Sequence, residues 1–233
     1  MQPQQLGEQV NGIATLAEPV RRGLYLWVVG QVEPVTRDQA SEGVGVARHT
    51  AKFHLDRLVE EGLLDVDYKR LTGREGPGAG RPTKRYRRSA RELSVALPER
   101  HYDLAGAVMA SAIERSVRQG SDVGDELELA AREQGAVIGR AASQNLPSRA
   151  SRAARVDAVT HALAERGYEP RVDGSVVTMA NCPFHRLATE HTDLVCGMNL
   201  AMLSAVVDEL RDPRLTTRLD PAPGRCCVTI DIG

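Results

Sequence analysis

The chain has 233 residues, a hydrophobic content of 42% and a formal net charge of −1. This length favours two modest domains, each with enough apolar residues for its own core. No apolar run approaches the about 18 residues of a membrane span, and the N-terminus has no secretory pattern, so we expect a cytoplasmic protein. Aromatic residues make up only 3%, which argues against binding of single-stranded nucleic acid by base stacking.

Charges and cysteines are distributed unevenly along the chain. Residues 1–93 carry 15 Lys and Arg against 12 Asp and Glu, whereas residues 94–233 carry 15 against 19. All four cysteines lie within the last 52 residues. Clustered thiols in a cytosolic chain favour metal or redox chemistry over disulfides. We therefore expect a basic N-terminal part and a thiol-bearing C-terminal part with separate roles.

Three helices are predicted in the first part of the chain. After a loose N-terminal segment, apolar residues recur at helical spacing over residues 16–29. Thr36 and Gln39 form a capping box that starts a second helix, which Gly43 and Gly45 end before a third helix begins. This order of helix, helix, tight turn and helix is typical of a helix-turn-helix unit.

The third helix, over residues 46–61, sorts into two faces. Four apolar residues recur at helical spacing and are expected to form a stripe that faces the core: Ala51, Leu55, Leu58 and Val59. Off this stripe lie the side chains that a DNA-reading helix needs: Arg48, His49, Lys52, Phe53 and Arg57. The alternative is an ordinary surface helix with a solvated basic face. His54 is expected to pack beside the wing, with a phosphate contact as the alternative.

Two strands are predicted at residues 63–70 and 83–88, joined by a glycine-rich hairpin tip over residues 71–82. Between Asp67 and Arg91 there are nine basic residues against two acidic ones. No Gly-Lys-Ser/Thr follows the glycines, so a nucleotide-binding loop is not expected. Four cations of this wing are instead expected to reach DNA phosphates or a minor groove: Arg74, Arg81, Lys84 and Arg85.

The stretch "VARHTAKFHLDRLVEEGLL", followed by "GAGRPTKRYRRS", resembles the winged helix-turn-helix regulators of the ArsR-like superfamily over roughly residues 15–90. The resemblance implies that the third helix docks in the major groove of double-stranded DNA, usually as part of a dimer. It implies contacts to bases or nearby phosphates from Arg48, His49, Thr50, Lys52 and Phe53, and a backbone contact from Arg57. Tyr86 is expected to close the wing against the core.

Helices and then a small sheet are predicted in the second part of the chain. Helical patterns cover residues 98–120, 123–142 and 151–166, and their many apolar positions favour a helical linker that also forms a dimer interface. The alternative is that these helices simply cover the C-terminal sheet. Strands are predicted at residues 168–172, 175–180, 215–219 and 226–232, with a helix over residues 192–210.

The expected fold class is α+β, with three domains. A winged helix-turn-helix DNA-binding domain covers residues 11–92. A helical linker and dimerisation segment covers residues 97–150. A small C-terminal α/β sensor domain covers residues 151–233.

The four cysteines fall where one end of the predicted sheet can bring them together. Cys182 follows a strand, Cys196 lies near a helix N-terminus, and Cys226 and Cys227 begin the last strand. Neighbouring strand residues point to opposite faces, so one of the tandem pair is expected to face the site, and the pattern leaves open which one. The chain lacks a Cys-x-x-Cys pair, which argues against a zinc finger. The alternative is a set of buried, inert thiols.

The segments "CPFH", "LVCGMNLAML" and "PGRCCVTI" behind this N-terminal domain resemble the iron–sulfur-sensing repressors of the Suf-operon type, and the resemblance covers nearly the whole chain. It implies an iron–sulfur cluster, of the [4Fe–4S] type, bound by Cys182, Cys196 and either Cys226 or Cys227. Three cysteines leave one iron to be ligated by water, by a small thiol or by one of four side chains: His185, His191, Asp193 or Asn199.

The sequence therefore predicts a homodimeric transcriptional regulator, a repressor, whose cluster controls its binding to an operator. It predicts neither an enzyme nor a membrane partner. One alternative assigns the cysteines to Zn²⁺ or another metal, or to a thiol redox switch. Another makes Cys182 or Cys196 a nucleophile with His185 or His191 as its base, which the lack of an acidic orienting residue and an oxyanion loop disfavours.

Overall fold

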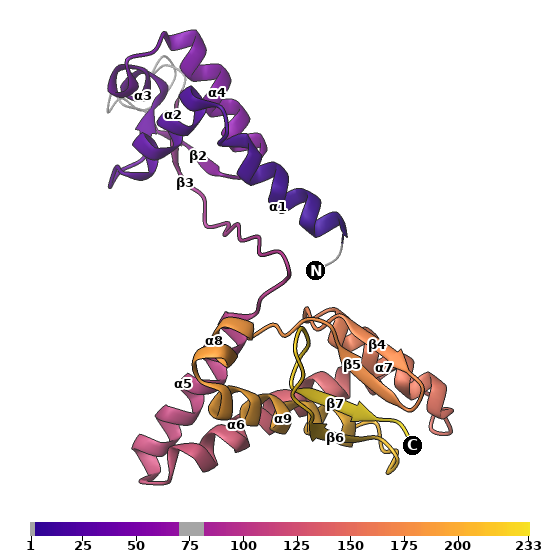
Figure 1. Ribbon diagram of the computed structural model, residues 1–233. Coiled ribbons are helices and arrows are strands. Elements are labelled where there is room, and N and C mark those ends of the chain that lie inside the picture. The colour runs from indigo at the N-terminus through magenta and orange to yellow at the C-terminus, as the bar shows by residue number, and fades with distance from the viewer. Residues whose placement is uncertain (1–2, 70–81) are drawn as a thin grey trace. The chain divides into compact units, whose positions relative to one another are not determined.

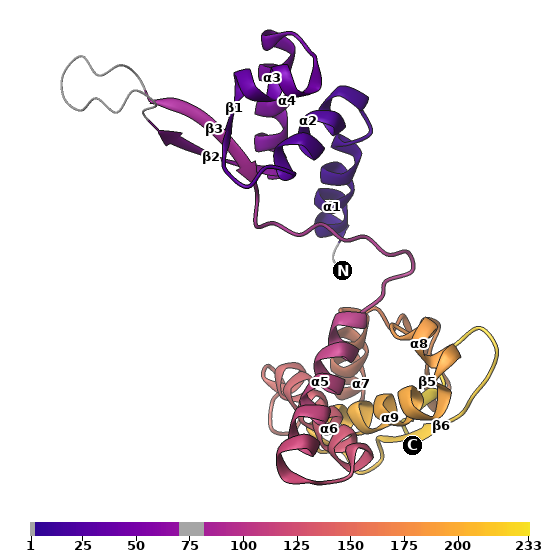
Figure 2. The same ribbon diagram turned by 90° about the vertical axis from the view of Figure 1, so that its left-hand side faces the viewer.

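The computed structural model describes residues 3–69 and 82–233 of the chain. It divides into two compact units, an N-terminal unit (Gln2–Val95) and a C-terminal unit (Ala96–Gly233), whose elements are labelled in Figure 1 and, for β1, in Figure 2. Each unit combines helices with an antiparallel sheet, so the expected α+β class is confirmed. No helix in the described ranges is long and apolar enough to cross a membrane.

The N-terminal unit contains four helices and a three-stranded sheet among its described residues, in the strand order β1-β3-β2. Its elements are α1 (Pro3–Thr15), α2 (Pro19–Val29), β1 (Val35–Thr36), α3 (Arg37–Val44), α4 (Arg48–Glu60), β2 (Leu64–Lys69) and β3 (Thr83–Arg88). The N-terminal segment that the sequence led us to expect as loose is helix α1. The helix expected from Leu16 begins instead at Pro19, because the Glu18 carboxylate accepts hydrogen bonds from the Val20 and Arg21 amides and caps it.

The junction between α3 and α4 follows the local sequence closely. The predicted capping box is present: Thr36 Oγ1 accepts from the Gln39 amide, and Gln39 Oε1 accepts from the Thr36 amide. Gly45 ends α3 with φ +72°, a left-handed conformation that glycine adopts without strain. Gly43 lies against the Trp27 ring, where a Cβ would clash, so glycine lets α3 lie directly on α2.

The core of this unit lies between the helices and the inner face of the sheet. Ala51, Leu55 and Leu58 are fully buried, as the predicted stripe requires, while Val59 is half-buried. Tyr86 on β3 is 2% exposed and closes the hairpin against the helices, as predicted. Packing of this stripe fixes which face of α4 points outward.

The C-terminal unit is built on a four-stranded antiparallel sheet in the order β4-β5-β7-β6. Its elements are α5 (Tyr102–Gln119), α6 (Val123–Ser143), α7 (Arg152–Ala164), β4 (Pro170–Asp173), β5 (Val176–Met179), α8 (His185–Glu190), α9 (Thr192–Asp208), β6 (Thr216–Leu219) and β7 (Val228–Asp231). The predicted order of strand, strand, helix, strand and strand is present. The sequence reasoning missed the short helix α8.

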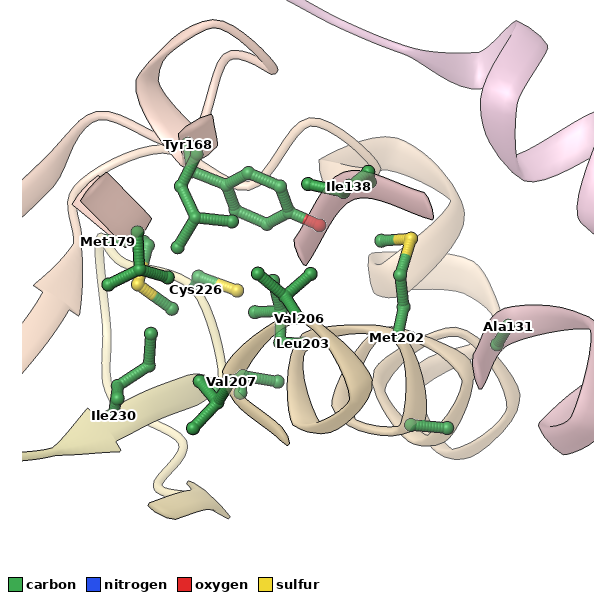
Figure 3. Close-up of a cluster of buried hydrophobic side chains, with 14 of the residues drawn as sticks. Ala131, Ile138, Tyr168, Met179, Met202, Leu203, Val206, Val207, Cys226 and Ile230 are labelled. Carbon is green, nitrogen blue, oxygen red and sulfur yellow. The ribbon is translucent and has the colours of Figure 1, made fainter. Parts of the chain in front are cut away.

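Helix α9 is the centre of this unit, and it is apolar on nearly all sides because α6, α8 and the sheet surround it. Gly135 and Gly139 of α6 bring the two helix backbones into close approach: a Cβ on Gly139 would lie 2.6 Å from the Val206 carbonyl oxygen. One continuous core joins α5 and α6 to α9 and the sheet, part of it shown in Figure 3. Residues 97–150, expected as a separate linker segment, therefore share one compact unit with residues 151–233.

Candidate functional site

The C-terminal unit brings the four cysteines into one neighbourhood. Cys182 lies in the loop between β5 and α8, Cys196 in the second turn of α9, and Cys226 and Cys227 in the turn that precedes β7. All four are free thiols. They interact in two pairs, Cys182 with Cys226 and Cys196 with Cys227, and the charge of each pair is felt by the other. Both members of the tandem pair, and not one alone, thus contact another cysteine.

Cys226 is the buried member of the site and is held by a short polar chain. Figure 3 shows it among Tyr168, Met179 and Val206, and it is 1% exposed. The Tyr168 hydroxyl donates to Asn199 Oδ1 over 2.6 Å, which turns the amide group so that Asn199 Nδ2 donates to Cys226 Sγ over 3.3 Å. The Cys226 amide donates to the Met179 carbonyl oxygen over 2.9 Å, which fixes the backbone beside β5.

Burial and pairing set the protonation of these thiols. Hydrogen bonding with Cys226, opposed by burial and assisted by the Phe184 amide, holds the pKa of Cys182 below its ordinary value. The same contact and burial raise the pKa of Cys226 far above it. Burial, followed by the contact with Cys227, raises the pKa of Cys196 to about 12. In the first pair, Cys182, the more exposed partner, therefore loses its proton more readily than Cys226.

The donor set fits a soft metal centre in kind. Thiolates are the ligands that iron–sulfur clusters and zinc prefer, and Asn199 supplies an N–H hydrogen bond of the type that tunes a cluster potential. In arrangement the thiols form two pairs, and no group of three or more His, Cys, Asp or Glu among the described residues is placed to hold a single metal ion. The cysteines therefore fit a metal centre in the chemistry of their side chains and in lying close to one another, and not as ligands already arranged around one ion.

The four side chains considered as a further ligand differ sharply in position. His185, His191 and Asp193 are exposed. Asp193 acts on the site only through its charge, which contributes to the raised pKa of Cys196. Asn199 is 2% exposed and contacts a thiol directly. Asn199 is thus the one of the four that the fold brings to the cysteines.

The outward face of α4 in the N-terminal unit carries most of the predicted reading residues. His49, Lys52, Phe53 and Arg57 are exposed, Phe53 by 65%, and Thr50 is half-buried. His49, Lys52, Phe53 and Arg57 line one side of a surface groove that Arg21 of α2 completes. We call five residues of α4 the reading face: Arg48, His49, Lys52, Phe53 and Arg57.

Ion pairs divide the cations of the reading face into two groups. Lys52 and His49 have no ion-pair partner in the described part of the chain. Arg48 is paired with Asp38 of α3, with 2.7 Å from Arg48 Nε to Asp38 Oδ1. Arg57 is paired with Glu60 and Glu61. The Arg48–Asp38 and Arg57–Glu60 pairs are exposed, and such pairs contribute about 0–1 kcal/mol each, so their exchange for a phosphate costs little.

The wing cations are tied down more firmly. Lys84 Nζ donates to Asp56 Oδ1 over 2.6 Å, and the Tyr86 hydroxyl donates to the same oxygen over 3.2 Å. Asp56 of α4 therefore anchors β3. Arg85, whose side chain is 15% exposed, makes a two-point pair with Asp67, its cross-strand partner on β2. Lys84 and Arg85, both predicted to reach DNA, thus hold the hairpin together within this unit.

Three remaining positions complete the comparison with the sequence. Arg74 and Arg81 lie outside the described residues. His54 is 9% exposed, as a packing role requires, but its Nδ1 accepts a hydrogen bond from Arg21 Nε of α2 over 3.3 Å, so it packs beside α2 and not, as expected, beside the wing. Sequence reasoning missed Asp56 and Tyr168. Asp56 carried a usable signal, an acidic residue in a basic helix, whereas Tyr168 had none beyond its place at the start of the strand predicted over residues 168–172.

Comparisons with known proteins leave the chain to be judged on its own geometry. No family model matches it. Neither the curated proteins nor the solved structures yield a match. The function must therefore be inferred from the reading face and from the cysteine centre.

Proposed function

We propose that this protein is a cytoplasmic, homodimeric transcriptional regulator, acting as a repressor, whose binding to double-stranded DNA is controlled by an iron–sulfur cluster held by its C-terminal cysteines. The observation that carries the proposal is the pairing of two unlike sites in one chain. One unit presents a helix with exposed cations and an exposed aromatic ring beside a β-hairpin, and the other gathers four thiols.

The arrangement of the N-terminal unit supports winged helix-turn-helix docking. Helix α4 follows α3 across the tight turn at Gly45, and its inner stripe is buried while His49, Lys52 and Phe53 point away from the core. Such a helix fits the major groove, which is about 12 Å wide. Phe53 offers an apolar edge suited to a thymine methyl group, and Lys52 a charge suited to phosphate or guanine. The hairpin β2–β3 is the proposed wing.

In the proposed cluster site, Cys182, Cys196 and one of Cys226 and Cys227 supply the thiolates. A cluster bound there supplies an oxidisable, removable inorganic centre. The protein's own part is to place the ligands. Among them Cys182 has a lowered pKa, whereas the pKa values of Cys196 and Cys226 are raised, so these two thiols would give up their protons only on binding. The Tyr168–Asn199 chain directs a donor at Cys226.

Helix α5 supports the proposed dimer. Its inner side, which includes Ala105, Val108 and Ala112, is buried. A second apolar stripe at helical spacing faces solvent: Tyr102, Ile113 and Val117 are 38%, 54% and 81% exposed. Exposed apolar stripes of this kind mark association surfaces. Val117→Glu is expected to convert the dimer to a monomer, as measured by light scattering. Arg118→Glu, one residue away, should keep the molar mass of the dimer.

The DNA proposal is tested with Lys52→Ala in a salt-dependent anisotropy titration on operator DNA. Loss of one phosphate contact weakens binding and lowers the slope of log K against log salt by about one. Arg118→Ala is the matched control, because it removes an exposed cation from the C-terminal unit and should leave both quantities unchanged. Equal affinity of the Lys52 variant and the parent protein would show that α4 does not carry the contact.

The cluster proposal is tested by anaerobic purification with visible absorption, iron and sulfide assays. Cys182→Ser and Cys196→Ser are each expected to abolish the absorption. Comparison of Cys226→Ser with Cys227→Ser then identifies the third ligand, because only one of them should retain full iron content. Iron and sulfide contents unchanged by both Cys182→Ser and Cys196→Ser would refute these ligand assignments.

The pairing of the thiols favours a second candidate, a thiol redox switch on the same regulator. Cys182 with Cys226, and Cys196 with Cys227, already influence each other's protonation as pairs. Zinc bound by the same thiols is the related alternative. A colourless protein that loses free thiols in pairs on oxidation, while its DNA affinity changes, would establish the redox switch in place of the cluster. A colourless protein that contains zinc would establish the zinc site.

A further inference from the structure

The chain enters the C-terminal unit through a segment that is hydrogen-bonded to the cysteine loop. Residues 99–101 follow the stretch that leads out of the N-terminal unit and precede α5 directly. Arg100 Nη1 donates to the Cys182 carbonyl oxygen over 3.0 Å and also to Asn181 Oδ1. The His101 amide donates to the Pro183 carbonyl oxygen over 3.1 Å. The contact therefore joins two segments about eighty residues apart.

Asn181 closes the contact from the other side. It is 6% exposed, and its Nδ2 donates to the Glu99 carbonyl oxygen over 2.9 Å and to the Gly167 carbonyl oxygen over 2.5 Å. Gly167 in turn packs against the Glu99 side chain, with no room for a Cβ at ordinary contact distance. Both functional atoms of the Asn181 amide are thus bonded, and its rotation is fixed by three partners. We call Arg100 and Asn181 the entry clamp.

The position of the clamp gives it a mechanical consequence. Arg100 does not bond to the Cys182 thiol but to its backbone carbonyl, so a shift of that residue along the loop moves or breaks the bond. On the other side, the clamp fixes where α5 starts and where the connecting stretch leaves the unit. Arg100 Nη1 bonds the Asn181 side chain and the Cys182 carbonyl oxygen from one nitrogen, so a displacement of either acceptor changes the contact.

We propose that Arg100 and Asn181 are positioning residues that transmit the state of the Cys182 loop to the connecting stretch and to the start of α5. What the clamp regulates rests on the proposed function, because the connecting stretch leads to the reading face. The coupling itself requires neither a cluster nor DNA and is tested without them.

The first experiment is a double-mutant cycle read by amide hydrogen exchange of the peptide covering residues 96–104. Cys182→Ser is expected to raise exchange there by about tenfold in the parent protein, and Arg100→Met by a similar factor. Combined, the two changes should give little more than either alone, because the loss of the interaction between the Cys182 and Cys226 side chains reaches this peptide through the Arg100 contact. Arg100→Lys, which keeps the charge on a single nitrogen but at a different reach, should give an intermediate rate.

Arg186→Met is the matched control, since Arg186 belongs to α8 beside the same loop, is exposed and pairs only within its own helix with Glu190. On its own it should leave exchange at residues 96–104 unchanged, and it should not alter the rise that Cys182→Ser produces. Two results would overturn the proposal. One is multiplication of the two factors in the Arg100–Cys182 double variant, and the other is an unchanged exchange rate in Arg100→Met.

The second experiment measures, with and without the iron–sulfur centre, the affinity for a DNA duplex that the parent protein has selected from random sequences. In the parent protein the ratio of the two affinities is expected to be about tenfold or more, a usual size for coupling between sites. In Arg100→Met the ratio should fall below about twofold, with iron and sulfide contents unchanged. A retained ratio would overturn the clamp. A parent protein without iron, in which the exchange cycle is still non-additive, would remove the proposed cluster and leave the clamp standing.

Discussion

Replacing Gly139 with alanine tests the close approach of α6 to α9, on which the placement of the cysteine centre depends. A Cβ at this position would lie 2.6 Å from the Val206 carbonyl oxygen, 2.7 Å from Glu209 Cβ and 3.0 Å from Val206 Cα. Ordinary contact begins near 3.4 Å, so the two helices must separate by about 0.8 Å. Two of the three neighbouring atoms are helix backbone, which cannot rotate away as a flexible side chain would.

Two effects of opposite sign determine the change in stability. Alanine favours the helical conformation over glycine by about 1 kcal/mol. Overpacking of a filled core costs about 1–3 kcal/mol, and contact with backbone places this site at the upper end of that range. We therefore expect the free energy of unfolding to fall by about 2 kcal/mol. Gly197→Ala is the matched control, because Gly197 lies within α9 with nothing within 4 Å of a Cβ and should gain up to about 1 kcal/mol.

Urea unfolding followed by far-UV circular dichroism measures both changes, since α6 and α9 are long helices. Trp27 is the single tryptophan of the chain and belongs to the N-terminal unit, so its fluorescence reports that unit separately and should not change in either variant. A Gly139→Ala protein as stable as the parent, or more stable, would show that the helices do not approach as described. The packing that places Cys196 would then have to be different.

Three further predictions concern single contacts. Asp56→Asn weakens the anchor of β3 on α4 and should lower the stability of the N-terminal unit, read by tryptophan fluorescence, by about 1–2 kcal/mol; no change would mean that the wing does not depend on this anchor. Asn199→Ala leaves the buried Tyr168 hydroxyl without its acceptor and should cost about 1–3 kcal/mol, most of which Tyr168→Phe in the same chain should restore. The Arg214 guanidinium lowers the pKa of Asp212 from 3.8 to about 2. The folded-state pKa is depressed, so this stabilisation is present above about pH 4 and is lost as pH falls towards 2. Asp212→Asn should therefore flatten the acid part of the stability profile between those values.

Local sequence rules predicted the elements whose ends are determined by residues a few positions apart. The Thr36–Gln39 capping box and the strand at Thr83–Arg88 lie where the sequence places them, because each depends on residues a few positions apart. Helix α1 was missed because its Gln-rich sequence has a weak apolar pattern. Strand β1 was missed because its two residues are a strand only through pairing with β3, which no local pattern records.

The sequence predicted which cysteines lie close together in the candidate site, but not which of them interact. Topology alone indicated that a loop, a helix start and a strand start could meet, and it named the four cysteines. It did not indicate that Cys227 would pair with Cys196, because Cys226 and Cys227 precede β7, in a turn where the strict alternation of a strand does not apply. Nor did it indicate that Arg85 is paired, since that depends on the register that sets Arg85 opposite Asp67.

The arrangement of the C-terminal unit decides which route a change at the cysteines can take. Helix α9 carries Cys196 and Asn199, and it is packed against α6 through backbone contacts at Gly135 and Gly139 that leave no space for sliding apart. A filled contact of this kind transmits displacement only by moving both helices together. The Cys182 loop is held to the start of α5 by directional hydrogen bonds instead, and these can be exchanged one at a time. A rearrangement at the cysteines therefore reaches the connecting stretch through Arg100 with the smallest cost in free energy, while α6 and α9 remain fixed.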